Sequence, residues 1–171
     1  RAAVMFDLVT SAASVHGAFW LEGAGLIFAE MQAMEWLVSL TGMPKGAFGV
    51  FTSGGTEANL SAMVAARENW RRHDPTKTRE RGIVIASNGA HSSISAMAKV
   101  IDADVVLIET ENRLEGSKLA ETIEAMDDAA RARVFAVIAT GGTTNSGIID
   151  DLAGIAEVCK RHGFWFHVDA A

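Results

Sequence analysis

Ser53, Gly54, Gly55 and Thr56 stand at the start of a predicted helix, and this combination suits the binding of a phosphate group. Glycine lets the backbone approach a ligand closely, and the first N–H groups of a helix have no intrahelical acceptors. The helix dipole favours negative charge at the same end. An ordinary turn with Thr56 as N-cap and Glu57 in the first helical turn fits these residues equally well, so the segment alone leaves both interpretations open.

Three further polar residues, His91, Thr144 and Asp169, each follow a predicted strand. In open α/β sheets ligands bind beyond the carboxyl ends of the strands, so we expect these side chains to meet there. Each also has a structural explanation: a loop histidine, a strand-to-loop turn, and a carboxylate that caps the next helix. Asp150 and Asp151 are predicted to cap the helix that follows them.

The elements that position these residues alternate along the chain. Helical spacing of apolar residues is found at 24–41, and a second helix, rich in alanine, is predicted at 56–72. Val50, Phe51 and Thr52 form a short apolar stretch, which is predicted to be a strand that leads into the glycines. Beyond Pro75, strands are predicted at 83–86, 104–108, 134–140 and 165–168, and helices at 93–101, 118–131 and 151–162. Continuously apolar strands that alternate with helices indicate an α/β fold, with a mainly parallel sheet and helices on both faces.

Composition excludes several classes of partner. The formal net charge of −6 argues against nucleic acid or an anionic membrane, since an acidic surface repels both. The small basic cluster Arg67, Arg71 and Arg72 is predicted to be a solvated helix face. The sequence contains no run of eighteen apolar residues, so no transmembrane helix is predicted. We expect the apolar start of the chain to belong to the body of a domain. The single cysteine, Cys159, is predicted to be a core residue and suits a reducing cytoplasm.

Four segments together resemble a known family. They read Thr-Ser-Gly-Gly-Thr-Glu-Ala-Asn-Leu at 52–60, Ala-His-Ser-Ser at 90–93, Gly-Thr-Thr-Asn-Ser-Gly at 142–147 and Phe-His-Val-Asp-Ala-Ala at 166–171. In this order and spacing they are similar to the group II amino-acid decarboxylases, which use pyridoxal 5'-phosphate. The resemblance implies the large domain of pyridoxal-phosphate fold type I, present here in part.

The resemblance also implies a cofactor site without a metal ion, made of Ser53, Gly54, Gly55, Thr56, His91, Thr144, Asp169 and Ala171. Gly55 and Thr56 would hold the phosphate, in a turn shaped by the two residues before them. His91 would stack on the cofactor ring and Asp169 would face the pyridine nitrogen, so these two are the predicted catalytic residues. Thr144 would lie close to the ring and its substituents. Ala171 would lie beside the ring, where a larger side chain would collide with it.

From the same resemblance we expect residues 1–44 to be a helical segment that packs on a partial cofactor-binding domain, residues 45–171. The function implied is decarboxylation of an α-amino acid to an amine and CO₂ by a longer, cytoplasmic, homodimeric carboxy-lyase. The Schiff-base lysine of the family is expected beyond Ala171, and none of the lysines at positions 45, 77, 99, 118 and 160 matches its position. We therefore expect the 171 residues by themselves to be an inactive fragment.

Other functions are compatible with parts of the pattern. A carbon–carbon lyase of the sphingosine-phosphate type shares the Ser-Gly-Gly-Thr-Glu turn and the His-Val-Asp strand, and a non-catalytic relative would keep the fold alone. A metal-dependent hydrolase could use His91, His167 and Asp169, although their spacing is not that of a typical ligand set. His167 is expected on the same strand face as Asp169, and the resemblance gives it no chemical role.

Overall fold

The computed structural model describes the backbone of residues 1–171 and the side chains of all of them except Pro75 and Thr78. Its elements follow the order α1 (Ala2–Ala13), α2 (Trp20–Leu40), α3 (Gly55–His73), η1 (Pro75–Arg79), β1 (Ile83–Ser87), α4 (Ser93–Val100), β2 (Asp104–Ile108), α5 (Gly116–Ala125), α6 (Asp128–Arg133), β3 (Val134–Thr140), α7 (Leu152–His162) and β4 (Trp165–Asp169). Among the described helices, none has the length and apolarity needed to cross a membrane.

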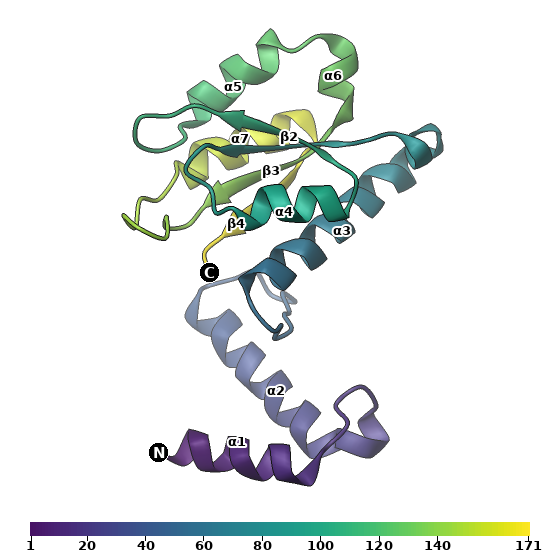
Figure 1. Cartoon of the computed structure of the whole chain (residues 1–171), viewed down its shortest axis with the longest axis vertical. Helices are drawn as coiled ribbons and strands as arrows, with labels where there is room; N and C mark the ends of the chain where they lie inside the picture. Colours follow the sequence, from purple (N-terminus) through teal and green to yellow (C-terminus); the bar gives the residue numbers. More distant parts are fainter. The chain divides into compact units, whose positions relative to one another are not determined.

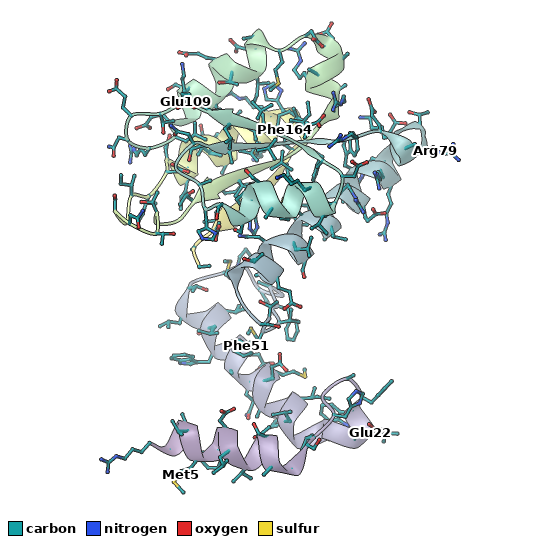
Figure 2. All side chains as sticks on the ribbon, viewed as in Figure 1. Met5, Glu22, Phe51, Arg79, Glu109 and Phe164 are labelled. Atoms are coloured by element: carbon teal, nitrogen blue, oxygen red, sulfur yellow. The ribbon has the colours of Figure 1, made fainter. Side chains whose placement is uncertain are left out.

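The chain divides into two compact units, Arg1–Phe51 and Thr52–Ala171. The first unit holds α1 and α2, and α2 begins four residues before the predicted 24–41 helix. Gly23 has a non-helical backbone inside α2, and a Cβ there would lie 2.8 Å from the carbonyl oxygen of His16. Large apolar side chains of α1, among them Met5 in Figure 2, are between 63% and 73% exposed: Val4, Met5, Phe6, Leu8 and Val9. The packing of residues 1–44 on residues 45–171 stays a prediction.

The second unit is built on a parallel sheet with the strand order β2–β1–β3–β4. Helices α3 and α4 contribute to the apolar core on one face, and α5 and α7 contribute to the core on the other (Figure 1). The α/β class, the parallel sheet and the helices on both faces are therefore confirmed.

Strand register brings the carboxyl ends of the strands to one edge of the sheet. Every residue of β1 and β3 is buried, because these central strands are covered on both faces and flanked on both sides. At their carboxyl ends Ser87 of β1 pairs with Ile108 of β2, and Thr140 of β3 pairs with Asp169 of β4. The polar residues that follow these strands are thus held at neighbouring points of the same edge.

Two local predictions were wrong. The helix predicted at 118–131 is two helices, α5 and α6, and the second begins at an N-cap, Asp127, whose carboxylate accepts the backbone N–H of Ala130 at 2.7 Å. An Asp that captures a backbone N–H in this way begins a new helix without any Gly or Pro. The apolar stretch before the two glycines, residues 50–52, is not a strand.

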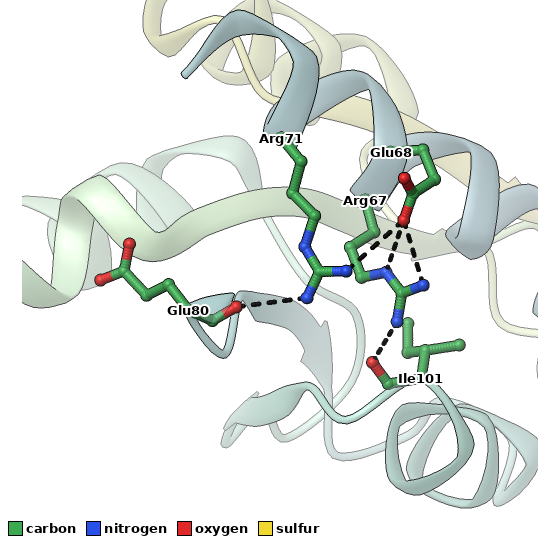
Figure 3. Close-up of polar contacts among 5 residues, drawn as sticks. All are labelled: Arg67, Glu68, Arg71, Glu80 and Ile101. Atoms are coloured by element: carbon green, nitrogen blue, oxygen red, sulfur yellow. Dashed lines mark hydrogen bonds and ion pairs between the residues drawn. The ribbon is translucent and has the colours of Figure 1, made fainter. Parts of the chain in front are cut away.

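The basic cluster on α3 is largely not a solvated face. The side chains of Arg67 and Arg71 are 18% and 20% exposed, and both contact Glu68 (Figure 3). Arg67 also donates to the backbone carbonyl of Ile101 at 2.5 Å, and Arg71 donates to that of Glu80 at 3.5 Å. These two guanidinium groups tie α3 to the end of α4 and to the segment that leads into β1.

Candidate cofactor site

A cavity of about 290 Å³ lies at the carboxyl ends of β1, β3 and β4. Its walls come from the start of α3, from the loops after β1 and β3, and from the end of β4. The lining residues are Gly55, Thr56, Asn59, His91, Ser93, Thr140, Gly142, Thr143, Thr144, Asp169 and Ala171. The cavity therefore stands where an open parallel sheet ordinarily binds its ligand.

The start of α3 is left without a side-chain cap. Gly54 is the N-cap residue, and no side chain accepts a hydrogen bond from the first N–H groups, so Thr56 is not the N-cap. Glu57 instead turns back to Ser53, whose hydroxyl and backbone N–H donate to its carboxylate at 2.6 and 3.1 Å. These two hydrogen bonds, the hydroxyl's first, lower the pKa of Glu57. Gly55 and Thr56 face the cavity, and the unpaired N–H groups of this turn suit an anionic group.

The backbone at Gly55 approaches the end of β4 so closely that a side chain is excluded. A Cβ added at Gly55 would lie 2.7 Å from the Cβ of Ala171. Contacts below 3.0 Å between such atoms do not occur without a shift of the chain. Glycine at 55 and a small residue at 171 are therefore both required where the helix start meets the cavity.

His91 lies in the loop between β1 and α4, and its ring is held by the following helix. The backbone N–H of Ser93 donates to Nδ1 of His91 at 3.2 Å. Because Nδ1 accepts this bond, the neutral ring carries its proton on Nε2. The imidazole therefore has a defined orientation in the cavity wall, and Nε2–H is its available donor.

The loop after β3 presents two threonines to the cavity. Gly141 and Ile149 pair as an antiparallel bridge that closes the loop at its base. Inside it, the backbone N–H of Thr143 donates to the carbonyl of Ile148 at 2.9 Å, and the Thr143 hydroxyl accepts the N–H of Ile148 at 3.1 Å. Thr143 is thereby committed to the loop, while Thr144 lines the cavity without a hydrogen bond of this kind.

Asp150 ties that loop to the sheet, which corrects its predicted role as part of an N-cap pair. Its carboxylate is buried and accepts the backbone N–H of Leu114 at 2.8 Å and that of Thr140 at 2.7 Å. Asp151 is the N-cap of α7 and accepts the N–H of Gly154 at 3.0 Å. Adjacency in the sequence suggested one role for both residues, but the buried carboxylate of Asp150 binds the backbone N–H groups of Thr140 in β3 and of Leu114 before α5 instead.

Asp169 ends β4, and its carboxylate is held from the side of α3. Its Oδ2 accepts Nδ2 of Asn59 at 3.0 Å, and its Oδ1 accepts the backbone N–H of Ala171 at 3.3 Å. Asn59 is 3% exposed and also donates to the hydroxyl of Ser93 at 3.3 Å. The carboxylate is therefore part of a partly buried network that joins α3, α4 and β4.

His167 completes this network two residues before Asp169, on the face of β4 where it was expected. Its Nε2 lies 2.8 Å from Oδ1 of Asn59. Burial lowers the pKa of His167, and the nearby carboxylate of Asp169 opposes that shift. The ring is therefore biased towards its neutral form.

The structure brings six of the eight predicted site residues to the cavity: Gly55, Thr56, His91, Thr144, Asp169 and Ala171. Ser53 and Gly54 form the turn before it and do not line it. Sequence reasoning missed Asn59, although its place one turn after Gly55 puts it on the same face of α3. In the described part of the chain, no group of three or more His, Cys, Asp or Glu residues could hold a metal ion.

Comparison with known proteins decides the family. Residues 2–171 match the family model of the pyridoxal-dependent decarboxylase conserved domain. The chain belongs to the pyridoxal-dependent decarboxylase family. An aromatic-L-amino-acid decarboxylase of Bacillus atrophaeus is 33% identical over 172 residues, which cover 98% of this chain and 35% of that protein. An L-2,4-diaminobutyrate decarboxylase of Acinetobacter baumannii is 32% identical over 174 residues, which cover 89% of this chain and 34% of that protein.

Solved structures agree with this assignment. The crystal structure of Oryza sativa TDC with PLP and tryptamine superposes with a TM-score of 0.88 at 29% identity, over 99% of this decarboxylase-family chain and 38% of that one. The chain thus spans between 34% and 38% of the length of these three relatives. The resemblance found in the four sequence segments and the fold type it implied are confirmed.

The residues of the cavity fit pyridoxal phosphate, the cofactor of this family. An uncapped helix start with a threonine hydroxyl suits the phosphate, and the carboxylate of Asp169 suits a protonated ring nitrogen. The imidazole of His91 supplies a flat wall. Gly55 and Ala171 line the cavity with a bare backbone and a single methyl group, so neither projects a larger side chain into it.

Proposed function

We propose that this chain supplies the cofactor-binding part of an enzyme that decarboxylates an α-amino acid to an amine and CO₂. The observation that carries the proposal is the convergence of Asp169, His91 and the uncapped start of α3 on one cavity, in a chain of the pyridoxal-dependent decarboxylase family. We also assign the predicted residue roles to this cavity. Gly55 and Thr56 bind the phosphate, and the residues that contact the ring are His91, Thr144, Asp169 and Ala171.

The residues of the chain bind, orient and polarise. Pyridoxal phosphate, when bound, supplies an electron sink for the bond that is broken at the amino acid's Cα. The carboxylate of Asp169 would face the protonated ring nitrogen, and the N–H groups of Gly55 and Thr56 would hold the phosphate. His91 would cover one face of the ring, and its Nε2–H would remain available as a donor, because Nδ1 accepts the N–H of Ser93. These contacts hold the reacting group in one orientation.

The test uses protein expressed from the complete reading frame and measures release of CO₂ from a panel of α-amino acids. We expect Asp169→Ala to lower turnover by more than about a hundredfold, because the charge that holds the proton on the ring nitrogen is lost. Asp128→Ala, which removes a carboxylate that is 93% exposed on α6, should leave turnover unchanged. Wild-type protein that binds the cofactor but releases no CO₂ from any amino acid would refute the proposal.

We further propose a cytoplasmic homodimer. A single buried cysteine agrees with a reducing compartment. The exposed apolar side chains of α1 agree with a surface that another protein chain covers. Sedimentation of the purified protein over a range of concentrations tests the dimer, and fractionation of cells tests the compartment. A protein that stays monomeric at all concentrations would refute the proposed dimer.

A further inference from the structure

We propose that Asn59 is the positioning residue of Asp169, and that His167 fixes the orientation of the Asn59 carboxamide. This inference deepens the proposed function and rests on it, since it concerns how the carboxylate is presented to the cofactor's ring nitrogen. Neither residue was part of the predicted site. Both are assigned from hydrogen bonds that join α3 to β4.

The side-chain amide of Asn59 has a defined orientation. Nδ2 of Asn59 lies 3.0 Å from Oδ2 of Asp169, and an ionised carboxylate can only accept hydrogen bonds. The NH₂ group must therefore face Asp169, and its second hydrogen is directed to the hydroxyl of Ser93 at 3.3 Å. The amide oxygen is left to face Nε2 of His167, 2.8 Å away.

The orientation of Asn59 determines the tautomer of His167. Because the amide oxygen of Asn59 is an acceptor, Nε2 of His167 must carry a proton to bond with it. Burial favours the neutral ring, and in the neutral ring this proton is the only one, so that Nδ1 carries none. A reversed amide would place the Asn59 oxygen against the Asp169 carboxylate. His167 prevents this reversal, because its Nε2–H holds the Asn59 oxygen on the opposite side.

The hydrogen bond from Asn59 orients the carboxylate of Asp169. Asn59 is 3% exposed, so its hydrogen bond to the carboxylate is shielded from water. The bond occupies Oδ2 from the α3 side, while the backbone N–H of Ala171 donates to Oδ1. The carboxylate plane is thereby fixed, and its remaining lone pairs face the cavity that Asp169 lines.

Cofactor binding gives a readout that a merely structural role would not move. The probes are pyridoxal phosphate and its 1-deaza analogue, which keeps the phosphate and aldehyde but carries C–H in place of the ring nitrogen. The dissociation constants of both are measured by titration of the apoprotein from the complete reading frame. The ratio of the two constants isolates the contact with the ring nitrogen from the other contacts of the cofactor.

We expect wild-type protein to prefer the natural cofactor, and Asn59→Ala to lower that preference by at least about tenfold, the scale of a hydrogen bond to a charged group. His167→Gln keeps an amide N–H donor and should stay within about threefold of wild type, while His167→Phe should lose more. Asn69→Ala, the same substitution at an exposed site on α3, is the matched control and should change nothing.

The outcomes separate the two proposals. A wild-type preference that survives in Asn59→Ala overturns the positioning role and leaves the proposed function standing. A wild type that does not bind the natural cofactor, or does not distinguish the two probes, overturns the assignment of Asp169 and this inference with it.

A second measurement does not depend on cofactor. Long-range ¹H–¹⁵N correlation spectra of ¹⁵N-histidine-labelled apoprotein report which ring nitrogen of His167 is protonated. The signal that is missing from the spectrum of His167→Gln is assigned to His167. We expect the Nε2–H tautomer. A bare Nε2 would leave the Asn59 oxygen without its donor and would overturn the proposal.

Discussion

Replacing Asp150 with alanine removes the acceptor of two buried backbone N–H groups at the base of the loop that carries Thr143 and Thr144. The carboxylate is 4% exposed and lies 2.8 Å from the N–H of Leu114 and 2.7 Å from that of Thr140. A buried donor left unsatisfied costs about 1–3 kcal/mol, so the two together predict a loss of about 2–6 kcal/mol in the free energy of unfolding. Water that entered the space would bring the loss towards the lower figure.

The assay is urea denaturation of the protein, combined with hydrogen exchange of the peptides that contain Leu114 and Thr140. We expect a lower midpoint with an unchanged slope, and faster exchange at both amides. Asp127→Ala is the matched control, since its carboxylate also accepts a backbone N–H but at an exposed helix start, where the loss is about 1 kcal/mol. A smaller loss for Asp150→Ala than for Asp127→Ala would refute the argument that burial decides the cost.

Three more predictions follow from buried groups. Burial raises the pKa of the Cys159 thiol to about 11, so a thiol reagent at pH 8 should label it after denaturation and not before; rapid labelling of native protein would contradict this. Burial lowers the pKa of His167 below its ordinary 6.5, so the unfolded chain binds the proton first, and stability is lost as the pH falls below about 6.5. Denaturation midpoints between pH 7.5 and 5.5 should fall less in His167→Gln, and an equal fall would refute the assignment. A Cβ at Gly116 would lie 2.5 Å from the carbonyl carbon of Gly154, so Gly116→Ala should separate α5 from α7 and lower the melting temperature, whereas an unchanged value would show that the helices adjust freely.

Most of the sheet could be predicted because its central strands are short, continuously apolar runs, which are typical of buried parallel strands. Residues 83–86 and 134–140 are apolar without alternation, as expected of strands covered on both faces. The rule that ligands bind at the carboxyl ends of such strands then predicts that His91, Thr144 and Asp169 lie together. The cavity lined by all three follows from that rule and from the strand register.

The parts that could not be predicted depend on which backbone or side-chain partner a polar group finds. Asp150 and Asp151 are adjacent and chemically equal, and burial alone separates a loop anchor from a helix cap. Asn59 was passed over because an asparagine inside an alanine-rich helix carries no motif of its own. Its partners on β4 lie more than a hundred residues away along the chain, so the pairing follows from the packing of α3 on the sheet.

The spacing of residues on α3 shows why the site and the core cannot be separated. Gly55, Asn59, Met63 and Ala66 recur every three or four residues and so share one face of the helix. Met63 and Ala66 are fully or almost fully buried in the core against the sheet, which fixes the rotation and height of the helix over β4. With that rotation set, Asn59 must point at Asp169, and Gly55 must meet Ala171. The apolar half of this face therefore positions its polar half, and the geometry offered to a cofactor is a consequence of how the core is packed.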